Sequence, residues 1–496
     1  MFHMQLRFCV VSQFFIGFIK IYDLFCVLGK IAKSKENEIN MTKKMQEMDM
    51  LHGSIWNKMV VFALPLGLTS MLQQLYNAAD VFFLGHFVGG EDMAAVGNSI
   101  SVIFLIVMLF VGMSIGANVV MARYLGQGKR GEASATMYTG IWVALLTGLT
   151  IMFIGLLCSD LIVEAMGVPK EVREPADIYL CWYFLAMPFI SLFNFEAAFF
   201  RSKGDTATPL WALCLSCSFN VVGNYLAVGV FNTGINGVAC ATLLSYVLSS
   251  LYLWGRLMRE SDFLKLQLRK LKSIDMRKAR AIISIGLPAG VQGMVFGIAN
   301  LIFQVAINSL GADAMAGSAA GFTIENNLYC FVNAFGLAAT TFIGQCYGAG
   351  DMQRCRRVFI VSFGWCTGLA LIVGVGGYFI SPWLLTFFTD SQIVADIAML
   401  RVLYVMGFQF LNAMIEALSD SMRGYGWSMP PAIIAMFCIC GERLWWLYAI
   451  YPSKPDYETL MVTYPISWAL TAVVELLAYI YCLRKFSRQY EATPLM

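Results

Sequence analysis

The feature that most constrains this chain is an apolar run from Met59 to Leu84, which contains no Lys, Arg, Glu or His and a single acid, Asp80. A run of this length is typical of a transmembrane helix, because about 20 helical residues cross the hydrocarbon core of a bilayer. A carboxylate at the centre of such a helix costs at least about 2.5 kcal/mol on insertion scales, so it faces protein or a water-filled cavity. Asp80 is therefore a functional candidate.

Eleven further apolar stretches follow, separated by short polar connections. The chain is 59% hydrophobic and 13% charged, whereas soluble domains carry about 25% charged residues. We therefore predict an all-α polytopic membrane protein with 12 transmembrane helices. The predicted spans are 59–84, 94–121, 134–157, 176–200, 208–230, 234–255, 281–308, 314–344, 356–380, 393–421, 430–451 and 459–483.

Lysine and arginine are distributed unevenly between the two sets of connections. If the first span starts in the cytoplasm, the inner connections and termini hold 24 of these residues, and the outer connections hold only Lys170, Arg173 and Lys454. Cytoplasmic loops carry the excess of Lys and Arg in membrane proteins. We therefore predict a multi-pass protein of the cell membrane with both termini in the cytoplasm.

Residues 1–40 form an N-terminal extension with several interpretations. An apolar stretch at 8–28 is interrupted by Lys20 and Asp23. An upstream mis-start, with the working protein beginning at Met41 or Met45, explains this pattern. A weak thirteenth span or an uncleaved signal-like segment explains it as well.

The second half of the chain repeats the first at a spacing of about 222 residues. FALPLGL (62–68) resembles SIGLPAGV (284–291), YLGQGKR (124–130) resembles CYGAGDM (346–352), and RSKGDTATP (201–209) resembles RGYGWSMPP (423–431). Each copy holds six spans, and because six is even, both copies start on the same side of the membrane. Such copies are related by an axis along the membrane normal.

The repeat predicts the domain organisation. We expect an N-terminal six-helix bundle at 50–258, a basic cytoplasmic linker at 259–280, a C-terminal six-helix bundle at 281–485 and a cytoplasmic tail at 486–496. The two parallel-related bundles are expected to surround a central cavity. In the second span, Gly112 and Gly116 form a GxxxG motif, which allows close approach of helices.

Two polar stripes occur within apolar spans. Gln73, Asn77 and Asp80 fall on one face of the first helix, and Asn220 and Asn224 share a face of the fifth. Lipid offers amides no partner, so the stripes should face each other or water. Hydrogen bonding between helices for stability also explains the amides.

The repeat provides a control for Asp80. Its C-terminal counterpart is Phe303 or the neighbouring Ile302, and neither side chain ionises. A carboxylate that served only the shared fold would be expected in both halves. Its presence in one half favours a role in coupling for the N-terminal bundle.

LPLGLTSMLQQLYNAADVFFLGHFVG (64–89), YLGQGKR, RSKGDTATP and GERLWWLY (441–448) resemble the multidrug and toxic compound extrusion (MATE) family. The likeness covers roughly residues 50–485. It implies a secondary exporter of organic, often cationic, compounds that works by antiport against protons or sodium ions and by alternating access.

The resemblance also implies a cation-coupling site. Asp80 matches the family's first-helix aspartate, Asn220 and Asn224 match its fifth-helix residues, and Thr242 in the sixth span is a further oxygen ligand. Some members carry Asp at the position of Asn224. One carboxylate in place of two favours protons over sodium ions as the coupling ion.

Several residues are candidates for the substrate cavity. Aromatic and Met side chains suit flat cations through cation–π contacts and adaptable surfaces. The predicted cavity residues are Gln73, Tyr76, Asn77, Gln292, Glu325 and Glu416. Other acids at membrane depth are Glu196, Asp420, Glu442 and Glu475. Of these, Asp420 and Glu475 are near helix ends and are expected to be hydrated.

Other classes of function find little support. The chain has three scattered histidines and no nucleophile–base constellation, so we predict neither an enzyme nor a metal or cofactor site. No GxxxxGK[ST] motif occurs, so ATP is not expected to drive transport directly. The expected partners are a small-molecule substrate and the lipid bilayer, with no nucleic acid, and we expect a monomer.

A flippase for a lipid-linked precursor, on a related architecture, is the alternative. It would need spans beyond twelve and basic residues in the cavity, for which Arg401 and Arg443 are the chief candidates.

Overall fold

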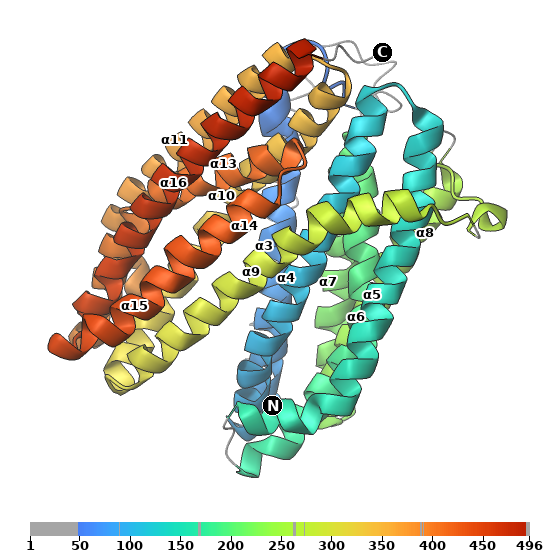
Figure 1. Cartoon of the computed structure of the whole chain (residues 1–496). Coiled ribbons are helices and arrows are strands. Elements are labelled where there is room, and N and C mark those ends of the chain that lie inside the picture. Colours follow the sequence, from blue (N-terminus) through green and yellow to red (C-terminus); the bar gives the residue numbers. More distant parts are fainter. Residues whose placement is uncertain are drawn as a thin grey trace. The chain divides into compact units, whose positions relative to one another are not determined.

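The computed structural model describes residues 48–88, 90–166, 170–260, 264–271, 273–386, 389 and 391–492. The predictions for residues 1–40 lie outside this part of the chain. Within the unit Asp49–Met496, the described elements are all helices, as Figure 1 shows.

The first half of the unit contains six spans. They are α3 (Ile55–Phe87), α4 (Gly90–Gly126), α5 (Arg130–Ala165), α6 (Lys170–Ser202), α7 (Ala207–Asn224) with the π-helical segment η1 (Tyr225–Val230), and α8 (Gly234–Arg259). The short 3₁₀ helix η2 (Leu268–Lys270) lies in the linker.

The second half repeats this series. Its elements are α9 (Met276–Asn308), α10 (Ala312–Gly348), α11 (Met352–Leu385), α12 (Gln392–Arg401) with η3 (Val402–Met406) and α13 (Gln409–Gly424), α14 (Met429–Ala435) with η4 (Met436–Gly441) and α15 (Glu442–Ala449), η5 (Tyr451–Ser453), and α16 (Tyr457–Ala492). The linker is shorter than predicted, since α9 already begins at Met276, where Asp275 accepts a hydrogen bond from the Arg277 backbone N–H and caps the helix.

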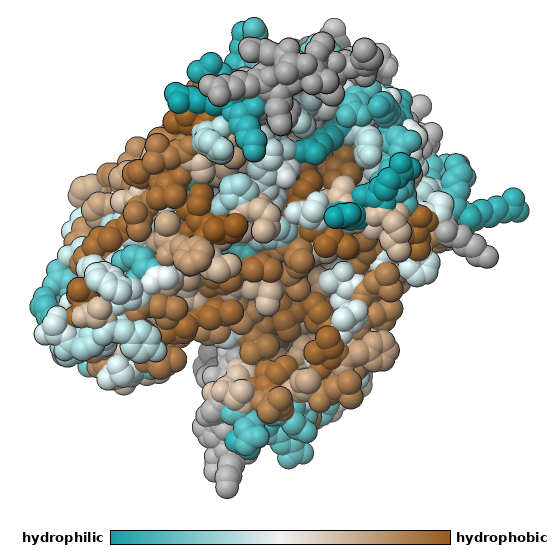
Figure 2. Space-filling view, viewed as in Figure 1, coloured by the Kyte–Doolittle hydropathy of each residue, from teal (hydrophilic) through white to brown (hydrophobic). Residues whose placement is uncertain are grey.

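In the described part of the chain, eleven helical segments are long and apolar enough to span a bilayer. A twelfth is formed by α10, whose parts Ala312–Asn326 and Tyr329–Gly348 are bent by 41°. Large apolar side chains on their surfaces are exposed, among them Leu157 and Phe379, and Figure 2 shows apolar residues over the middle of the helices with polar residues near their ends. The predicted all-α fold with 12 spans is confirmed.

The backbone of the connections repeats with the sequence. Gly128 and Gly350 both have positive φ, at 71° and 78°, and so do Gly204 and Gly426, at 100° and 77°. L-residues with a side chain rarely adopt this conformation, which explains glycine at these positions. Both pairs are 222 residues apart. The spacing therefore relates backbone conformation as well as sequence.

Connections of one kind lie at the same ends of the spans. Residues 127–129, 203–206, 260–275, 349–351 and 425–428 join these ends, which we call the basic end. The other ends of the spans are the opposite end. The positive-inside pattern predicts that the basic end is cytoplasmic.

The two halves meet along α4, which lies beside α9 in Figure 1. A Cβ atom on Gly112 would collide with the backbone at Ala289 and Gly290, and one on Gly116 would collide with the backbone at Ile282. The close helix approach predicted for the GxxxG motif is thereby confirmed.

Near the basic end, α4 also packs against α10. The Asn118 amide donates to Thr341 Oγ1 at 2.8 Å. One turn and more beyond, a Cβ atom on Gly126 would collide with the Gln345 carbonyl, and Arg123 donates to the Tyr425 carbonyl. Direct contacts thus hold the two halves together at the basic end.

Candidate functional site

Asp80 is fully buried on α3 and accepts hydrogen bonds from three other helices. The donors are Asn224 Nδ2 at 2.7 Å, Thr242 Oγ1 at 2.8 Å, Tyr179 OH at 2.9 Å and Asn220 Nδ2 at 3.3 Å. Four neutral donors thus satisfy the two carboxylate oxygens without any ion pair in the described part of the chain. The structure brings the four predicted coupling residues together and adds Tyr179.

Helix geometry explains the arrangement. Asn220 and Asn224 are one turn apart on α7, so both amides reach the same carboxylate from one face. The π-helical segment η1 begins at Tyr225, immediately after Asn224. Single π-helical turns inside α-helices are frequent at functional sites. Because each donor stands on a helix that is packed on its other faces, the site is well ordered.

The donors are also bonded to one another. Asn220 Nδ2 donates to Thr242 Oγ1 at 3.0 Å, and Asn224 Nδ2 donates to Asn220 Oδ1 at 3.3 Å. Asn224 Oδ1 is buried and has no hydrogen-bond partner among the described residues. The site therefore offers one unused acceptor next to the acid.

Different donors permit different protonation states of Asp80. An amide NH₂ can only donate, whereas the hydroxyls of Thr242 and Tyr179 can donate or accept. When Asp80 carries a proton, either hydroxyl can turn to accept it, and Asn224 Oδ1 is a third available acceptor. The arrangement can hold the acid with or without a proton while the helices stay in place.

A tyrosine cluster extends from this site. Tyr183 OH lies 3.3 Å from Tyr246 OH, and the rings of Tyr179 and Tyr183 are 5.8 Å apart. Tyr76 OH donates to the Thr242 carbonyl at 3.3 Å, and its ring packs on Tyr246 at 5.2 Å. Tyr76, predicted to line the substrate cavity, is thus buried beside the coupling residues.

Sequence reasoning missed Tyr179. Tyrosine is common in apolar helices, so one tyrosine gives no signal. Two features could have identified it. Tyr183 follows one turn later on the same face, and the repeat spacing aligns Tyr179 with the charged residue Arg401.

The other predicted cavity residues of the first half are less informative. Gln73 is half-buried on α3. The side chain of Asn77 lies outside the described part of the chain. Gln292 on α9 is buried and accepts a hydrogen bond from Arg423 Nη2 at 2.9 Å, so it is engaged in the packing of the second half.

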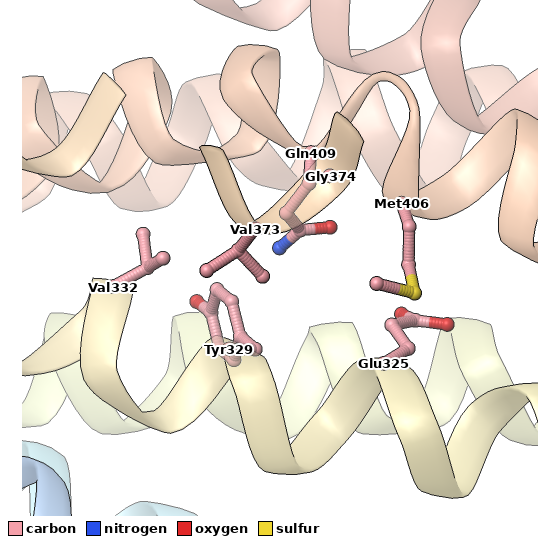
Figure 3. A pocket seen from close by; sticks show the side chains of 7 residues that line it. All are labelled: Glu325, Tyr329, Val332, Val373, Gly374, Met406 and Gln409. Carbon is pink, nitrogen blue, oxygen red and sulfur yellow. The ribbon is translucent and has the colours of Figure 1, made fainter. Parts of the chain in front are cut away.

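Glu325 borders a pocket in the second half (Figure 3). The pocket is lined by Glu325, Tyr329, Val332, Val373, Gly374, Met406 and Gln409. In Figure 3 the polar ends of Gln409 and Tyr329 point toward each other across it. It lies where α10 bends and where η3 interrupts the tenth span.

The acids at this pocket already have partners. Glu325 forms an ion pair with Arg401 at 3.0 Å, and Glu416 accepts a hydrogen bond from Tyr329 OH at 2.7 Å. Tyr329 thus links the two predicted cavity acids. None of their recorded bonds reaches the Asp80 site.

The two arginines considered for a lipid pyrophosphate are part of the internal packing. Arg401 is 5% exposed and also donates to Ser318. Arg443 is 2% exposed, donates to Asn300 at 3.0 Å, and lies over the ring of Tyr464 at 4.1 Å. Neither guanidinium projects into open space.

The expected hydration of two acids is wrong. Asp420 is 2% exposed and pairs with Arg423 at 2.5 Å, and Glu475 is fully buried and accepts two hydrogen bonds from Ser419. Their helices continue past them to the basic end, where neighbouring helices cover them. The Thr340 hydroxyl on α10, for example, donates to the Asp420 carbonyl.

The repeat places a different kind of site in the second half. Phe303, the counterpart of Asp80, is buried and its ring lies 5.9 Å from that of Tyr464, which is 222 residues after Thr242. Arg401 occupies the position of Tyr179 and binds Glu325. The N-terminal half therefore has an acid without a cation, and the C-terminal half has an ion pair.

Comparisons with known proteins agree with this architecture. The MatE family model matches residues 65–226 and 288–444. The chain is 29% identical to the probable multidrug resistance protein NorM of Thermotoga maritima, over 79% of this chain and 84% of that protein. It is 23% identical to an FAD transporter of Shewanella oneidensis, over 64% of this chain and 71% of that protein. A crystal structure of MATE in the bent conformation has the same fold, with a TM-score of 0.83 over 90% of this chain and 98% of that one, at 21% identity.

Proposed function

Because the chain belongs to the multidrug and toxic compound extrusion (MATE) family, we propose that it exports small organic compounds, cationic ones among them, in exchange for protons that bind at Asp80. The observation that carries the proposal is the full burial of Asp80 among four neutral donors. An ionisable side chain inside a transmembrane bundle is expensive and marks an ion pathway by default.

The donor set supports protons rather than sodium ions. A sodium ion is a hard cation and prefers several oxygen ligands, as calcium and magnesium do. Two of the four groups that face Asp80 present amide nitrogens, which cannot bind a cation. Only one carboxylate is present, because residue 224 is Asn.

One titrating acid is enough to drive export. Moving one charge across 100 mV is worth about 2.3 kcal/mol, and each unit of pH gradient adds about 1.4 kcal/mol. At 100 mV and one pH unit, a single proton therefore supports an uphill substrate ratio of a few hundred-fold, taking about 1.4 kcal/mol per factor of ten.

Alternating access requires that the proton bind one state more tightly than the other. In the described state the halves are joined at the basic end by Arg123, Asn118 and Gly126. With the basic end in the cytoplasm, a proton that enters from outside would reach Asp80 in this state. Turning of the Thr242 and Tyr179 hydroxyls would then change the packing of α6 and α8 against α3.

For the substrate we propose contacts on both sides of the interface between the halves. Gln73 on α3 is half-buried and is a candidate polar contact. Glu416 and Glu325 supply negative charge for cationic compounds, Glu416 more readily because its recorded partner, Tyr329, is neutral. The flippase alternative is not retained, because Arg401 and Arg443 are engaged in internal packing.

The test is substrate efflux from proteoliposomes with an imposed pH gradient or an imposed sodium gradient. We expect the pH gradient alone to drive efflux by the wild type, and Asp80→Asn to abolish it. Asp313→Asn is the control, because Asp313 is an exposed acid in the first turn of α10. Efflux by Asp80→Asn at the wild-type rate would refute the proposal, and efflux driven only by sodium would refute the choice of ion.

A further inference from the structure

The N-terminal half contains a second buried acid that the coupling site does not use. Glu196 on α6 is fully buried and accepts one hydrogen bond, from Ser250 Oγ on α8 at 3.1 Å. Its other oxygen, Oε1, is buried and has no hydrogen-bond partner within the described ranges. An acid with a free oxygen inside a transmembrane bundle is costly to keep for structure alone.

The C-terminal half offers a comparison. Glu475 on α16 is equally buried, but both of its oxygens accept from Ser419 on α13, at 2.9 and 3.0 Å. The repeat relates α6 to α13 and α8 to α16, so the same pair of helices carries a serine–glutamate pair with the two residues exchanged. Glu475 is satisfied, whereas Glu196 retains an open acceptor.

Glu196 lies between the coupling site and the basic end. It is six residues before the end of α6 at Ser202, which corresponds to roughly 9 Å of helix. Asp80 is seven residues from the end of α3 at Phe87, which is on the opposite end of the bundle. A proton that leaves Asp80 for the basic side must therefore pass the level of Glu196.

A stripe of hydroxyl groups connects the two acids. Thr242, Tyr246 and Ser250 follow one another at i, i+4 and i+8 on one face of α8. Thr242 donates to Asp80 at 2.8 Å, Tyr246 OH lies 3.3 Å from Tyr183 OH, and Ser250 donates to Glu196. Successive members are one turn, about 6 Å of helix, apart, so a single water molecule in each gap would complete a hydrogen-bonded chain.

Glu196 has no charged partner that would fix its protonation state. Helices α4, α5 and α8 pack against α6. Their charged residues in the basic half are Arg123 on α4, Glu132 on α5, and Arg256 and Arg259 on α8, all in end turns, with Arg201 near the end of α6 itself. Arg123 donates to Tyr425, Arg201 to Ser114, and Glu132 pairs with Lys278. The titratable groups that face the stripe are the tyrosines already named.

We propose that Glu196 is the inner proton-binding acid of this half: it receives the proton that Asp80 releases and passes it to water at the basic end. The inference rests on the proposed proton coupling at Asp80. In each step a hydroxyl accepts one proton and gives up another, so Thr242, Tyr246 and Ser250 remain neutral. Asp80 returns to its carboxylate form, and Glu196 does so when its proton leaves.

The test separates proton release from movement of the loaded carrier. Exchange of labelled for unlabelled substrate at equal pH on both sides needs only the substrate-loaded transitions. Net efflux driven by a pH gradient also needs proton release at the basic side, which a pH-sensitive dye in the matching compartment reports. Both are measured on the full chain in proteoliposomes.

We expect Glu196→Gln to keep substrate exchange and to lower gradient-driven efflux and the dye signal about tenfold or more, as for loss of a positioned proton-transfer group. Glu196→Asp should recover part of both. Glu475→Gln is the matched control and should leave all three readouts at wild-type values.

Each outcome decides between the ideas. Gradient-driven efflux by Glu196→Gln at the wild-type rate, with Asp80→Asn inactive, would overturn the role of Glu196 and leave the proposed function intact. Loss of exchange together with net efflux would show that Glu196 serves packing. Wild-type efflux that ignores the pH gradient would instead refute the proposed function.

Discussion

The packing of α4 against α9 makes a quantitative prediction at Gly112. A Cβ atom at this position would lie 2.6 Å from the Ala289 carbonyl carbon and closer still to Gly290. Ordinary van der Waals contact needs 3.4 Å or more, so Gly112→Ala must push the helices apart by roughly 1 Å. Such overpacking costs about 1–3 kcal/mol, which exceeds the ~0.5–1 kcal/mol that alanine gains over glycine within a helix.

The matched control is Gly97→Ala, because Gly97 is on the same helix and a Cβ atom there meets nothing within 4 Å. The free energy of unfolding of each variant can be measured by titration with a denaturing detergent in mixed micelles. We expect Gly112→Ala to lower it by about 1–2 kcal/mol and Gly97→Ala to leave it unchanged or to raise it. If the two variants have equal stability, the close contact between α4 and α9 is not what holds the halves together.

Two further predictions concern single side chains. Thr242→Val should reduce gradient-driven efflux strongly while Thr242→Ser retains most of it, because a hydrogen bond to a charged group is worth about 1.5–3 kcal/mol and serine keeps the donor to Asp80; equal efflux by both variants would remove the hydroxyl from the mechanism. Arg401→Gln should destabilise the protein by about 3–5 kcal/mol, because it leaves Glu325 buried without its partner, and adding Glu325→Gln should restore part of that loss in the same unfolding titration; a double variant that is less stable than Arg401→Gln would contradict the ion pair.

Much of the coupling site followed from the sequence because it depends on helix periodicity. Asn220 and Asn224 share a face at any tilt of their helix, and lipid gives their amides no partner, so contact with another polar group such as Asp80 was expected. Tyr179 could not be found in this way, because a tyrosine hydroxyl leaves no trace in an apolar pattern. Its role depends on which face of α6 meets α3.

Burial near helix ends was the weakest prediction. Asp420 and Glu475 lie near the ends of their predicted spans, where water would normally reach them, yet the structure covers both. Distance along one helix reports depth in the membrane but not which neighbours stand beside it. Tyr76 and Gln292 illustrate the same limit, since both were expected at a cavity and both are engaged in buried hydrogen bonds.

The difference between the two halves explains why one acid suffices. Arg401 stands where the repeat has Tyr179, and its guanidinium neutralises Glu325 within the protein. A proton that bound Glu325 would have to displace this ion pair, which is costly in a buried site. Asp80 faces only neutral donors, so a proton from water can bind it without breaking an ion pair. The same architecture thus carries a fixed cation in one half and leaves room for an exchangeable one in the other, which predicts one proton exchanged per transport cycle.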